Sequence, residues 1–369
     1  MSHTKPIHSA IYKAIANPVS EVKAGDIPIC DPCNSRVIES NRLQGMMAHA
    51  LGFKGCPVDW VSFHDNSRIK LKGFFDELDS LAVKLRDAGI PLVLIENGSI
   101  ARASYPCLGC FAFGDLDVIV DKWQLMEAHQ VLLENGYNPS SADEGELPNL
   151  CHGRAEYEKN LSVGLFRLNV QWSLVARRWF TGDREPRFDE LLSYSEEIDK
   201  NGVRILRPEH NLFQLCLHNT SHLYIRKPGV RLHLDVERLI RSAEINWDAY
   251  ISLAIRFHQK TASYITLLMS KLLFETPVPE WVLQTLRPSN WKEKQIVRIV
   301  FGKNLLESNE GKFAKLEFLT LSVLTYDNVG DLVRAVFPRL VEMRRIYVFQ
   351  SALLLPYFYT KRIIWMLRQ

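Results

Sequence analysis

The sequence contains few cysteines and no long apolar run. Seven of its 369 residues are cysteine, an odd number, and the start MSHTKPIHSAIYKAIANPVS lacks the continuous apolar core of a signal peptide. These features exclude a disulfide-stabilised scaffold. The longest late apolar stretch, 348–359, is too short to cross a bilayer and contains Gln350 and Pro356. We therefore expect a cytoplasmic protein.

The chain also lacks a strong excess of one charge. It has 45 Lys and Arg against 42 Asp and Glu, a formal net charge of +3, which is too small to indicate a nucleic-acid partner. A group of basic residues near the C-terminus lies among apolar ones, which fits either a closing helix with a solvated basic face or a membrane-contacting helix. We favour the first and expect no membrane contact. The group comprises Arg339, Arg344, Arg345, Lys361, Arg362 and Arg368.

One stretch, 95–120, carries most of the chemistry. It follows the apolar run Pro91–Ile95 and ends in Asp115-Leu116-Asp117-Val118-Ile119-Val120. In a strand, residues i and i+2 project from one face, so Asp115 and Asp117 would stand side by side. Two adjacent carboxylates repel each other unless a cation lies between them, and Mg²⁺ suits such a pair together with phosphate oxygens. The alternative is a strand end with two solvated carboxylates.

The turn before this strand is the second element of the pattern. A Gly98-Ser99 turn could bring backbone N–H groups near the same phosphates, and Arg102 could reach a phosphate with its planar guanidinium. The alternatives are a plain turn and a surface arginine.

A strand, Gly-Ser, and then Asp-x-Asp on the next strand resembles the nucleotidyltransferase superfamily that includes polymerase beta. GSIAR at 98–102 is similar to the GSxAR turn of its minimal bacterial members. The segments YPCLGCFAFGDLDVIV, LNVQWSL, LCLHNTSH and HLDVERLI, in that order, resemble the bacterial "uncharacterised nucleotidyltransferase" family, often encoded beside genes for natural-product or modified-peptide assembly. The resemblance implies that Asp115 and Asp117 hold two Mg²⁺ ions, and that Gly98 and Ser99 hold the β- and γ-phosphates of a nucleoside triphosphate.

The sequence departs from that superfamily at three places. A third carboxylate is usual on a later strand, but this chain has Asn169 and Gln171 there, which offer oxygen ligands without charge or basicity. Asn97 and Phe111 stand where many family members have a lysine and an arginine. We expect weaker metal binding, and either another base, an acceptor that needs none, or a site that binds without turnover.

Two histidines share one face of a later helix. His218 and His222 are four residues apart, and with Asp235 they could line the acceptor side of a cleft, where a histidine could replace the missing base. The alternative is helix–helix packing with internal hydrogen bonds. His152 is too isolated to interpret.

Two cysteine pairs have the spacing of metal ligands. Cys30 with Cys33 and Cys107 with Cys110 could together form a tetrahedral zinc site. The pairs are far apart in sequence, and we favour reduced thiols packed as small apolar groups.

Apolar periodicity divides the chain into three parts. The pattern of residues 1–70 predicts an N-terminal helical extension. Residues 71–207 alternate between helix and strand, which suits a small mixed sheet in a nucleotidyltransferase-like domain. The pattern of residues 208–369 predicts an all-helical domain. The fold class is therefore α+β. The expected helices of the last part are 209–224, 231–243, 247–274, 291–301, 312–324 and 332–359.

Together these patterns predict a Mg²⁺-dependent nucleotidyltransferase that moves a nucleotidyl or related phosphate-linked group from an activated donor to a hydroxyl of a small molecule or peptide. The alternatives are a nucleotidyltransferase fold that binds without catalysis and a nucleotide-sugar-dependent transferase.

Overall fold

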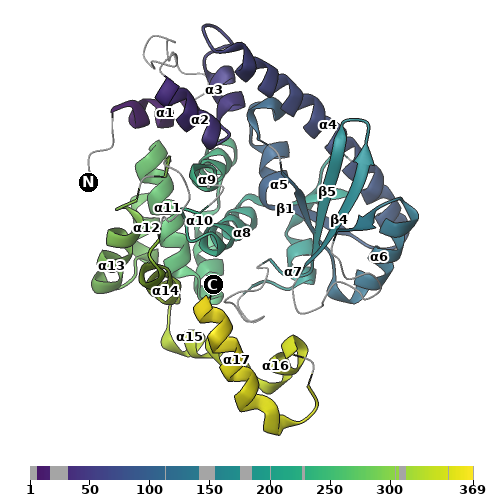
Figure 1. Cartoon of the computed structure of the whole chain (residues 1–369), viewed down its shortest axis with the longest axis vertical. Coiled ribbons are helices and arrows are strands. Elements are labelled where there is room, and N and C mark those ends of the chain that lie inside the picture. Colours follow the sequence, from purple (N-terminus) through teal and green to yellow (C-terminus); the bar gives the residue numbers. More distant parts are fainter. Residues whose placement is uncertain are drawn as a thin grey trace.

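A computed structural model gives the arrangement of the chain (Figure 1). The described residues are 6–16, 32–112, 114–140, 154–174, 185–199, 201–226, 229–303, 305–306, 313–347 and 349–368. His152 and Cys30 lie outside them.

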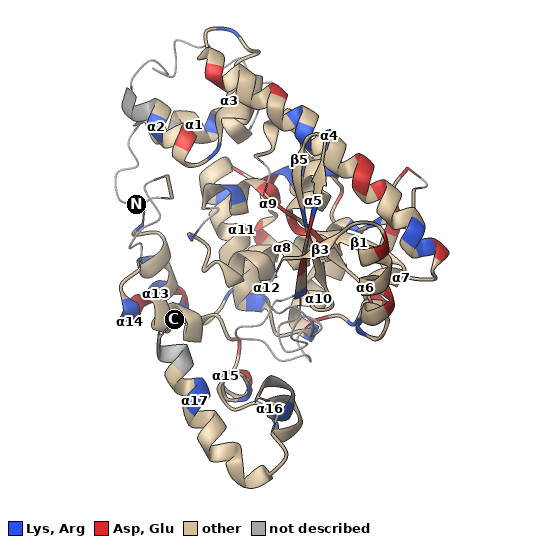
Figure 2. Ribbon diagram, turned by 45° about the vertical axis from the view of Figure 1, so that its right-hand side comes forward, with Lys and Arg blue, Asp and Glu red and all other residues tan. Residues whose placement is uncertain are grey.

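The N-terminal part is helical, as predicted. Helices α1 (Pro6–Ala16), α2 (Pro32–Ser40) and α3 (Gln44–Ala50) precede the long α4 (Val58–Asp87). Helix α4 buries Phe74, Leu78 and Leu85 on one side, and charged residues of both signs lie along the other (Figure 2). It is continuous across residue 70, where we expected a domain boundary.

A mixed sheet of seven strands forms the middle of the chain in the order β3-β4-β5-β2-β1-β7-β6. Strand β2 pairs with β1 antiparallel and with β5 parallel. The helices in this part are α5 (Glu96–Ala103), α6 (Leu125–Glu134) and α7 (Phe188–Ser193), with short 3₁₀ turns η2 (Leu108–Cys110) and η3 (Lys122–Gln124). The strands are β1 (Leu92–Ile95), β2 (Leu116–Ile119), β3 (Asn138–Pro139), β4 (Arg154–Leu161), β5 (Gly164–Gln171), β6 (Ser195–Glu197) and β7 (Val203–Leu206).

Both faces of the central strands are covered. In β1, Leu92 and Leu94 pack into the core that includes α4 and α6, whereas Val93 and Ile95 pack into the core shared with the later helices. This alternation is the two-residue period of a strand, and because both faces are buried the strand reads as continuously apolar. Ile95 pairs with Asp117 in register. Asp117 therefore lies on the sheet face that the later helices cover.

The C-terminal part is helical, as predicted, but two expected helices are broken. The segment 247–274 forms α10 and α11, because His258 between them has a left-handed φ of 54°. The segment 332–359 forms parts of α15, α16 and α17, and Pro338 lies in the first break. The helices are α8 (Pro208–Ser221), α9 (Val230–Ser242), α10 (Trp247–Arg256), α11 (Lys260–Phe274), α12 (Glu280–Leu286), α13 (Asn290–Val300), α14 (Lys315–Leu324), α15 (Val329–Val336), α16 (Leu340–Tyr347) and α17 (Leu355–Arg368), with a 3₁₀ turn η5 (Ala352–Leu354).

The α+β fold class is thus confirmed, with a mixed sheet and many helices including a helical C-terminal region. In Figure 1 the helices α8 to α12 lie on the opposite side of the sheet from α4 and α6. Across the described ranges, none of the helices has the length and apolar character needed to cross a membrane.

Candidate active site

A polar cavity with a volume of about 420 Å³ lies where the sheet meets helices α8 and α9. Its walls come from three parts of the chain: the end of α2 with the segment between α2 and α3, the ends of β1 and β5 with the starts of β2 and β4, and α9 with α8 and the residue that follows it. The lining residues are Ser40, Asn41, Arg42, Glu96, Asn97, Gly114, Asp115, Asp117, Arg154, Asn169, His218, His222 and Arg231. This volume is in the range of small-ligand sites, and the lining is unusually polar for one.

The two predicted carboxylates lie together on the cavity floor. Asp115 immediately precedes β2 and Asp117 is its second residue. The Asn169 amide nitrogen donates to Asp115 Oδ2 at 2.7 Å and to Asp117 Oδ1 at 2.9 Å. The Gln171 amide nitrogen donates to Asp117 Oδ1 at 2.8 Å. The structure therefore brings together four of the residues that the sequence singled out, with both amides donating to the carboxylates.

Asp117 is in an environment that disfavours its negative charge. It is 3% exposed, and burial raises the pKa of Asp117 well above its ordinary value; the charges of Glu96 and Asp115 raise it further. The hydrogen bonds from Asn169 and Gln171 lower the pKa only in part. A proton or a cation is needed to relieve this accumulation of negative charge.

Glu96 is a further cavity carboxylate, which we did not select from the sequence. It follows β1 directly, has a left-handed φ of 52°, and its Oε2 lies 2.9 Å from His218 Nδ1 on α8. Burial lowers the pKa of His218, but the charge and hydrogen bond of Glu96 outweigh it and raise that pKa to about 9. Burial likewise raises the pKa of Glu96, and the charge of His218 outweighs it, so the pKa of Glu96 is lowered. His218 and Glu96 thus form a buried ion pair near neutral pH.

His218 consequently carries a proton, which does not fit the role of general base that we considered for it. With Nδ1 bound to Glu96, the ring has only Nε2 left to donate, and Nε2 has no partner among the described residues. His222 also lines the cavity, with its ring centroid 4.7 Å from that of His218. The two histidines share a helix face as predicted. Asp235 does not line the cavity; it is buried and accepts a hydrogen bond from Tyr105 at 2.7 Å.

The Gly98-Ser99 segment forms the first turn of α5, not a separate turn. The Ser99 hydroxyl is fully buried, and its one O–H proton is shared between the Glu96 carbonyl oxygen at 2.8 Å and Asn211 Oδ1 at 3.2 Å. The expectation that this side chain holds phosphates does not fit the arrangement. Gly98 faces the sheet: a Cβ there would lie 2.8 Å from both Leu94 and Leu116 side chains. Its role in the structure is close packing of α5 on β1 and β2.

Helix α8 fixes this first turn of α5. Asn211 accepts from Ser99, the Gln214 side-chain oxygen accepts from the Glu96 backbone N–H at 3.3 Å, and His218 pairs with the Glu96 carboxylate. These three α8 residues are spaced three and four apart, so they lie on one helix face. The helical part therefore positions the carboxylate and the cavity wall at the end of β1.

Three arginines from separate elements line the cavity. Arg42 precedes α3, Arg154 begins β4, and Arg231 belongs to the first turn of α9. The Arg231 guanidinium lies 4.6 Å from the centre of the Phe111 ring, so α9 places a cation against this aromatic face. Asn97 lines the cavity, and its side-chain oxygen has no partner among the described residues.

Arg102 does not reach the cavity, and the expectation that it binds a phosphate does not fit this arrangement. Its guanidinium pairs with both oxygens of Asp79 at 2.6 and 3.0 Å and with Asp199 at 3.2 Å, and it lies over the Phe75 ring. Three of its five N–H donors are thus used by carboxylates, and one face of the group is covered by an aromatic ring. Its role is to join α5 to α4.

The cavity therefore combines a carboxylate pair with a set of positive side chains. Carboxylate oxygens are the ligands that Mg²⁺ prefers, so Asp115 and Asp117 fit a magnesium site. The arginines and protonated His218 suit an anionic group beside it. Such an arrangement can hold a phosphorylated ligand whose charge is shared between a divalent cation and protein donors.

One comparison with known proteins shows the family of this chain. A family model described as "Uncharacterised nucleotidyltransferase" matches residues 33–275. Among solved structures, the chain is similar to the crystal structure of JHP933 from Helicobacter pylori at 16% identity, covering 58% of this chain and 88% of that one with a TM-score of 0.31. A TM-score this low does not establish a common fold. No curated protein matches the chain.

Proposed function

Because this chain belongs to the uncharacterised nucleotidyltransferase family, we propose that it is a Mg²⁺-dependent transferase. Its donor is a nucleoside triphosphate and its acceptor is a hydroxyl of a small molecule or peptide. The observation that supports the proposal is the Asp115–Asp117 pair beside Asn169 at the floor of a cavity lined by three arginines. The cavity volume favours a single nucleotide and a small acceptor group.

In the proposed reaction, the acceptor oxygen bonds to the α-phosphorus while the bond to the bridging oxygen of the β-phosphate breaks, and pyrophosphate leaves. Asp115 and Asp117 would hold Mg²⁺, two ions being expected, which would neutralise the charge of the triphosphate and activate the hydroxyl. Such transfers depend on positioning and charge stabilisation.

The other cavity residues have separate roles in this proposal. Arg42, Arg154 and Arg231 bind the phosphate oxygens, and the Nε2–H of protonated His218 donates to an oxygen that gains charge. His222, which shares the helix face with His218, accepts the hydroxyl proton in place of a third carboxylate. Asn169 and Gln171 hold the carboxylates in position through their amide hydrogen bonds.

Calorimetric titration of nucleoside triphosphates with and without Mg²⁺ tests the binding step. The parent chain should bind with Mg²⁺ and lose affinity without it, and Asp117→Asn should lose the Mg²⁺-dependent part. Asp121→Asn is the matched control. Asp121 follows the same strand but does not line the cavity, and its carboxylate accepts a hydrogen bond from the Trp123 backbone N–H. Binding that is indifferent to both metal and Asp117→Asn would contradict the proposal.

Turnover needs its own measurement. Labelled nucleoside triphosphates incubated with hydroxyl-bearing candidate acceptors should release pyrophosphate and label the acceptor.

A second candidate is a nucleotide-binding protein that does not catalyse transfer. The Asn169 amide in the place of a third carboxylate favours it, because an amide has neither negative charge nor basicity. Tight Mg²⁺-dependent binding without pyrophosphate release for any nucleotide and acceptor would favour this candidate over the enzyme.

A further inference from the structure

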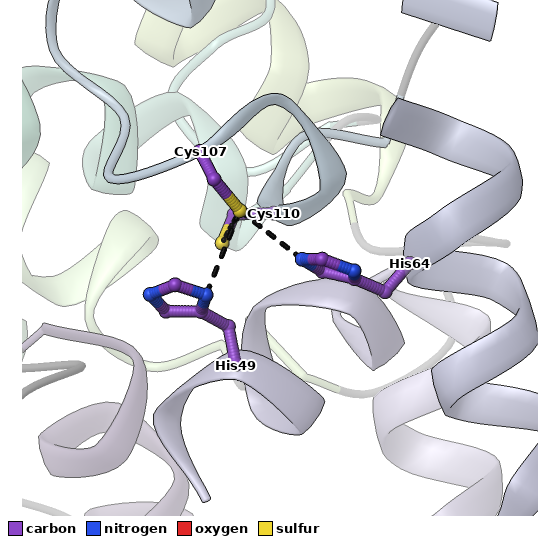
Figure 3. A group of neighbouring side chains, drawn as sticks. All are labelled: His49, His64, Cys107 and Cys110. Atoms are coloured by element: carbon purple, nitrogen blue, oxygen red, sulfur yellow. Dashed lines mark hydrogen bonds between the residues drawn. The ribbon is translucent and has the colours of Figure 1, made fainter. Parts of the chain in front are cut away.

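Four side chains outside the cavity converge on one point (Figure 3). They are His49 of α3, His64 of α4, and Cys107 and Cys110 of the loop that contains η2. Cys107 Sγ lies 3.2 Å from Cys110 Sγ, 3.1 Å from His64 Nε2 and 3.5 Å from His49 Nδ1. The four ligand-type atoms all lie within 4.8 Å of one another.

These distances fit a tetrahedral zinc centre better than the alternatives. Zn–S bonds of about 2.3 Å and Zn–N bonds of about 2.0 Å give ligand-to-ligand edges of about 3.3–3.8 Å. The distances of 3.1 and 3.2 Å are slightly shorter than these edges, so a bound ion would move the ligand atoms apart by a few tenths of an ångström. A sulfur–sulfur distance of 3.2 Å is too long for a disulfide, whose bond is about 2.05 Å, and both cysteines are free. Packing of thiols as apolar groups would not require two imidazole nitrogens to face them.

The surroundings of the cluster allow this close approach. A Cβ at Gly109, between the two cysteines, would lie 2.5 Å from His64 Nε2. A Cβ at Gly45 on α3 would lie 2.2 Å from the Gly109 carbonyl oxygen. Glycine at both positions therefore lets α3, α4 and the loop meet at the cluster.

The histidine on α4 also has the kind of second partner that metal ligands use. His64 Nδ1 lies 3.4 Å from the Asp65 carboxylate, which leaves Nε2 to face the sulfurs. A carboxylate on the far ring nitrogen fixes the tautomer and orientation of metal-bound histidines.

We propose that Cys107, Cys110, His49 and His64 bind one structural Zn²⁺ ion. Four protein ligands complete a tetrahedron and leave no open position, as in structural zinc sites. Binding releases the two thiol protons. In this proposal the partners of Cys107 and Cys110 are histidines. The pairing with Cys30 and Cys33 that the sequence suggested stays a prediction, because Cys30 lies outside the described residues and the side chain of Cys33 is not described.

The position of this centre gives it a role in building the cavity. Asp115 follows Cys110 by five residues along the chain, and Arg42 precedes His49 by seven. The ion would join the loop that leads to Asp115 and Asp117 to helix α3, which follows Arg42 of the cavity wall. This role is independent of the transfer reaction and holds whether or not the cavity catalyses.

Metal analysis of the tag-free full chain tests the proposal directly. The protein should contain about one zinc per chain. After removal of zinc under reducing conditions, Co²⁺ should produce the visible absorption of a tetrahedral ion together with a sulfur-to-cobalt charge-transfer band. A chain that holds no zinc and develops no such cobalt spectrum, or in which mass spectrometry finds Cys107 bonded to Cys110, would overturn the proposal.

Variants assign the ligands. Cys107→Ser should lose most of the zinc, at least about a 10-fold drop in content, and should lower the melting temperature. Cys56→Ser, which changes a free cysteine outside the cluster, should keep one zinc per chain. His64→Cys keeps four ligands and should retain zinc, and after replacement of zinc by Co²⁺ it should show a more intense sulfur-to-cobalt charge-transfer band. Full zinc content in a folded Cys107→Ser chain would contradict the assignment of Cys107 as a zinc ligand.

Discussion

Asn169 lies directly opposite Asp117 in the parallel pairing of β5 with β2, and its amide donates to the carboxylates of both Asp117 and Asp115. A carboxylate at position 169 would face two others at hydrogen-bonding distance. The amide therefore stabilises the cavity floor when no cation is present, and in the proposed magnesium site it would bind the metal more weakly than a carboxylate would.

The first prediction follows from this pair. Asn169→Asp should strengthen Mg²⁺ binding by about 10-fold, because a third carboxylate joins the site. Without Mg²⁺ the same change should lower the free energy of unfolding by about 1–3 kcal/mol, because a hydrogen-bond donor becomes a buried negative charge. Unfolding measured with and without Mg²⁺ checks both effects. Asn160→Asp on the exposed part of β4 should show neither; equal Mg²⁺ responses in the two variants would contradict the prediction.

A second prediction separates two arginines. Arg102→Gln should lower the free energy of unfolding by about 2 kcal/mol, because it breaks the partly buried pair with Asp79, and should leave nucleotide affinity unchanged. Arg42→Gln should instead weaken nucleotide binding about 5-fold and leave the free energy of unfolding nearly unchanged. Chemical denaturation and calorimetric titration of the two variants provide the test. A loss of nucleotide affinity in Arg102→Gln at full stability would show that the guanidinium leaves Asp79 to bind phosphate.

The third prediction concerns pH and the Glu96–His218 pair. The pKa of His218 rises from 6.5 to about 9 in the folded chain, so its stabilising contribution is complete below pH 6.5 and disappears as pH rises through 9. The pKa of Glu96 falls below its ordinary 4.5, so its contribution is present above that pH and is lost in acid. Glu96→Gln should therefore cost about 3 kcal/mol between pH 4.5 and 6.5 and progressively less toward pH 9.

Several neighbours affect the same histidine. Asp117 on β2 and Asp235 on α9 also raise the pKa of His218, while His222 and Arg231 line the cavity near it. Denaturation of the parent and of Glu96→Gln over this pH range checks the third prediction, with Glu127→Gln on α6 as the control. A stability difference that does not change between pH 5 and pH 9 would exclude a charged pair.

The fourth prediction concerns helix packing. Gly98→Ala should destabilise the chain by about 1–3 kcal/mol, because the added methyl would lie 2.8 Å from Leu94 and Leu116 and would push α5 away from the sheet. Gly114→Ala is the control: a Cβ there meets no atom within 4 Å. Thermal unfolding should separate the two variants by several degrees. Identical melting temperatures would show that the leucines move aside without cost.

The carboxylate pair could be predicted from the sequence because its signal is local. Alternation around Asp115 and Asp117 and the buried run after them indicate a strand, and a strand fixes which side chains share a face. The same reasoning placed Asn169 and Gln171 on one face. Their hydrogen bonds to Asp117 depend on the pairing of β5 with β2, which no local pattern specifies.

Glu96 was missed because a single carboxylate after an apolar strand is common. The available signal was its position, two residues before Gly98, at the end of a strand whose every residue is apolar. Its partner His218 is far away along the chain, and only the packing of α8 against α5 joins them. His49 and His64 were missed for the same reason: they meet Cys107 and Cys110 only after α3, α4 and the η2 loop have packed together.

The orientation of Ser99 and Arg102 could not be read from a motif either. A Gly-Ser-x-Ala-Arg motif does not specify which side of a helix faces the cavity. In the structure Ser99 faces α8 and Arg102 faces α4, since both neighbours offer oxygen acceptors, Asn211 on α8 and Asp79 on α4.

Helix α4 runs for 30 residues without a break, a length of about 45 Å. It carries His64 near one end and, further on, the apolar side chains that cover the back of the sheet. A recombinant fragment that starts at residue 71 would cut this helix in the middle and discard Arg42, His49 and His64 with it. Expression trials on shortened versions should therefore retain the residues from α2 onward.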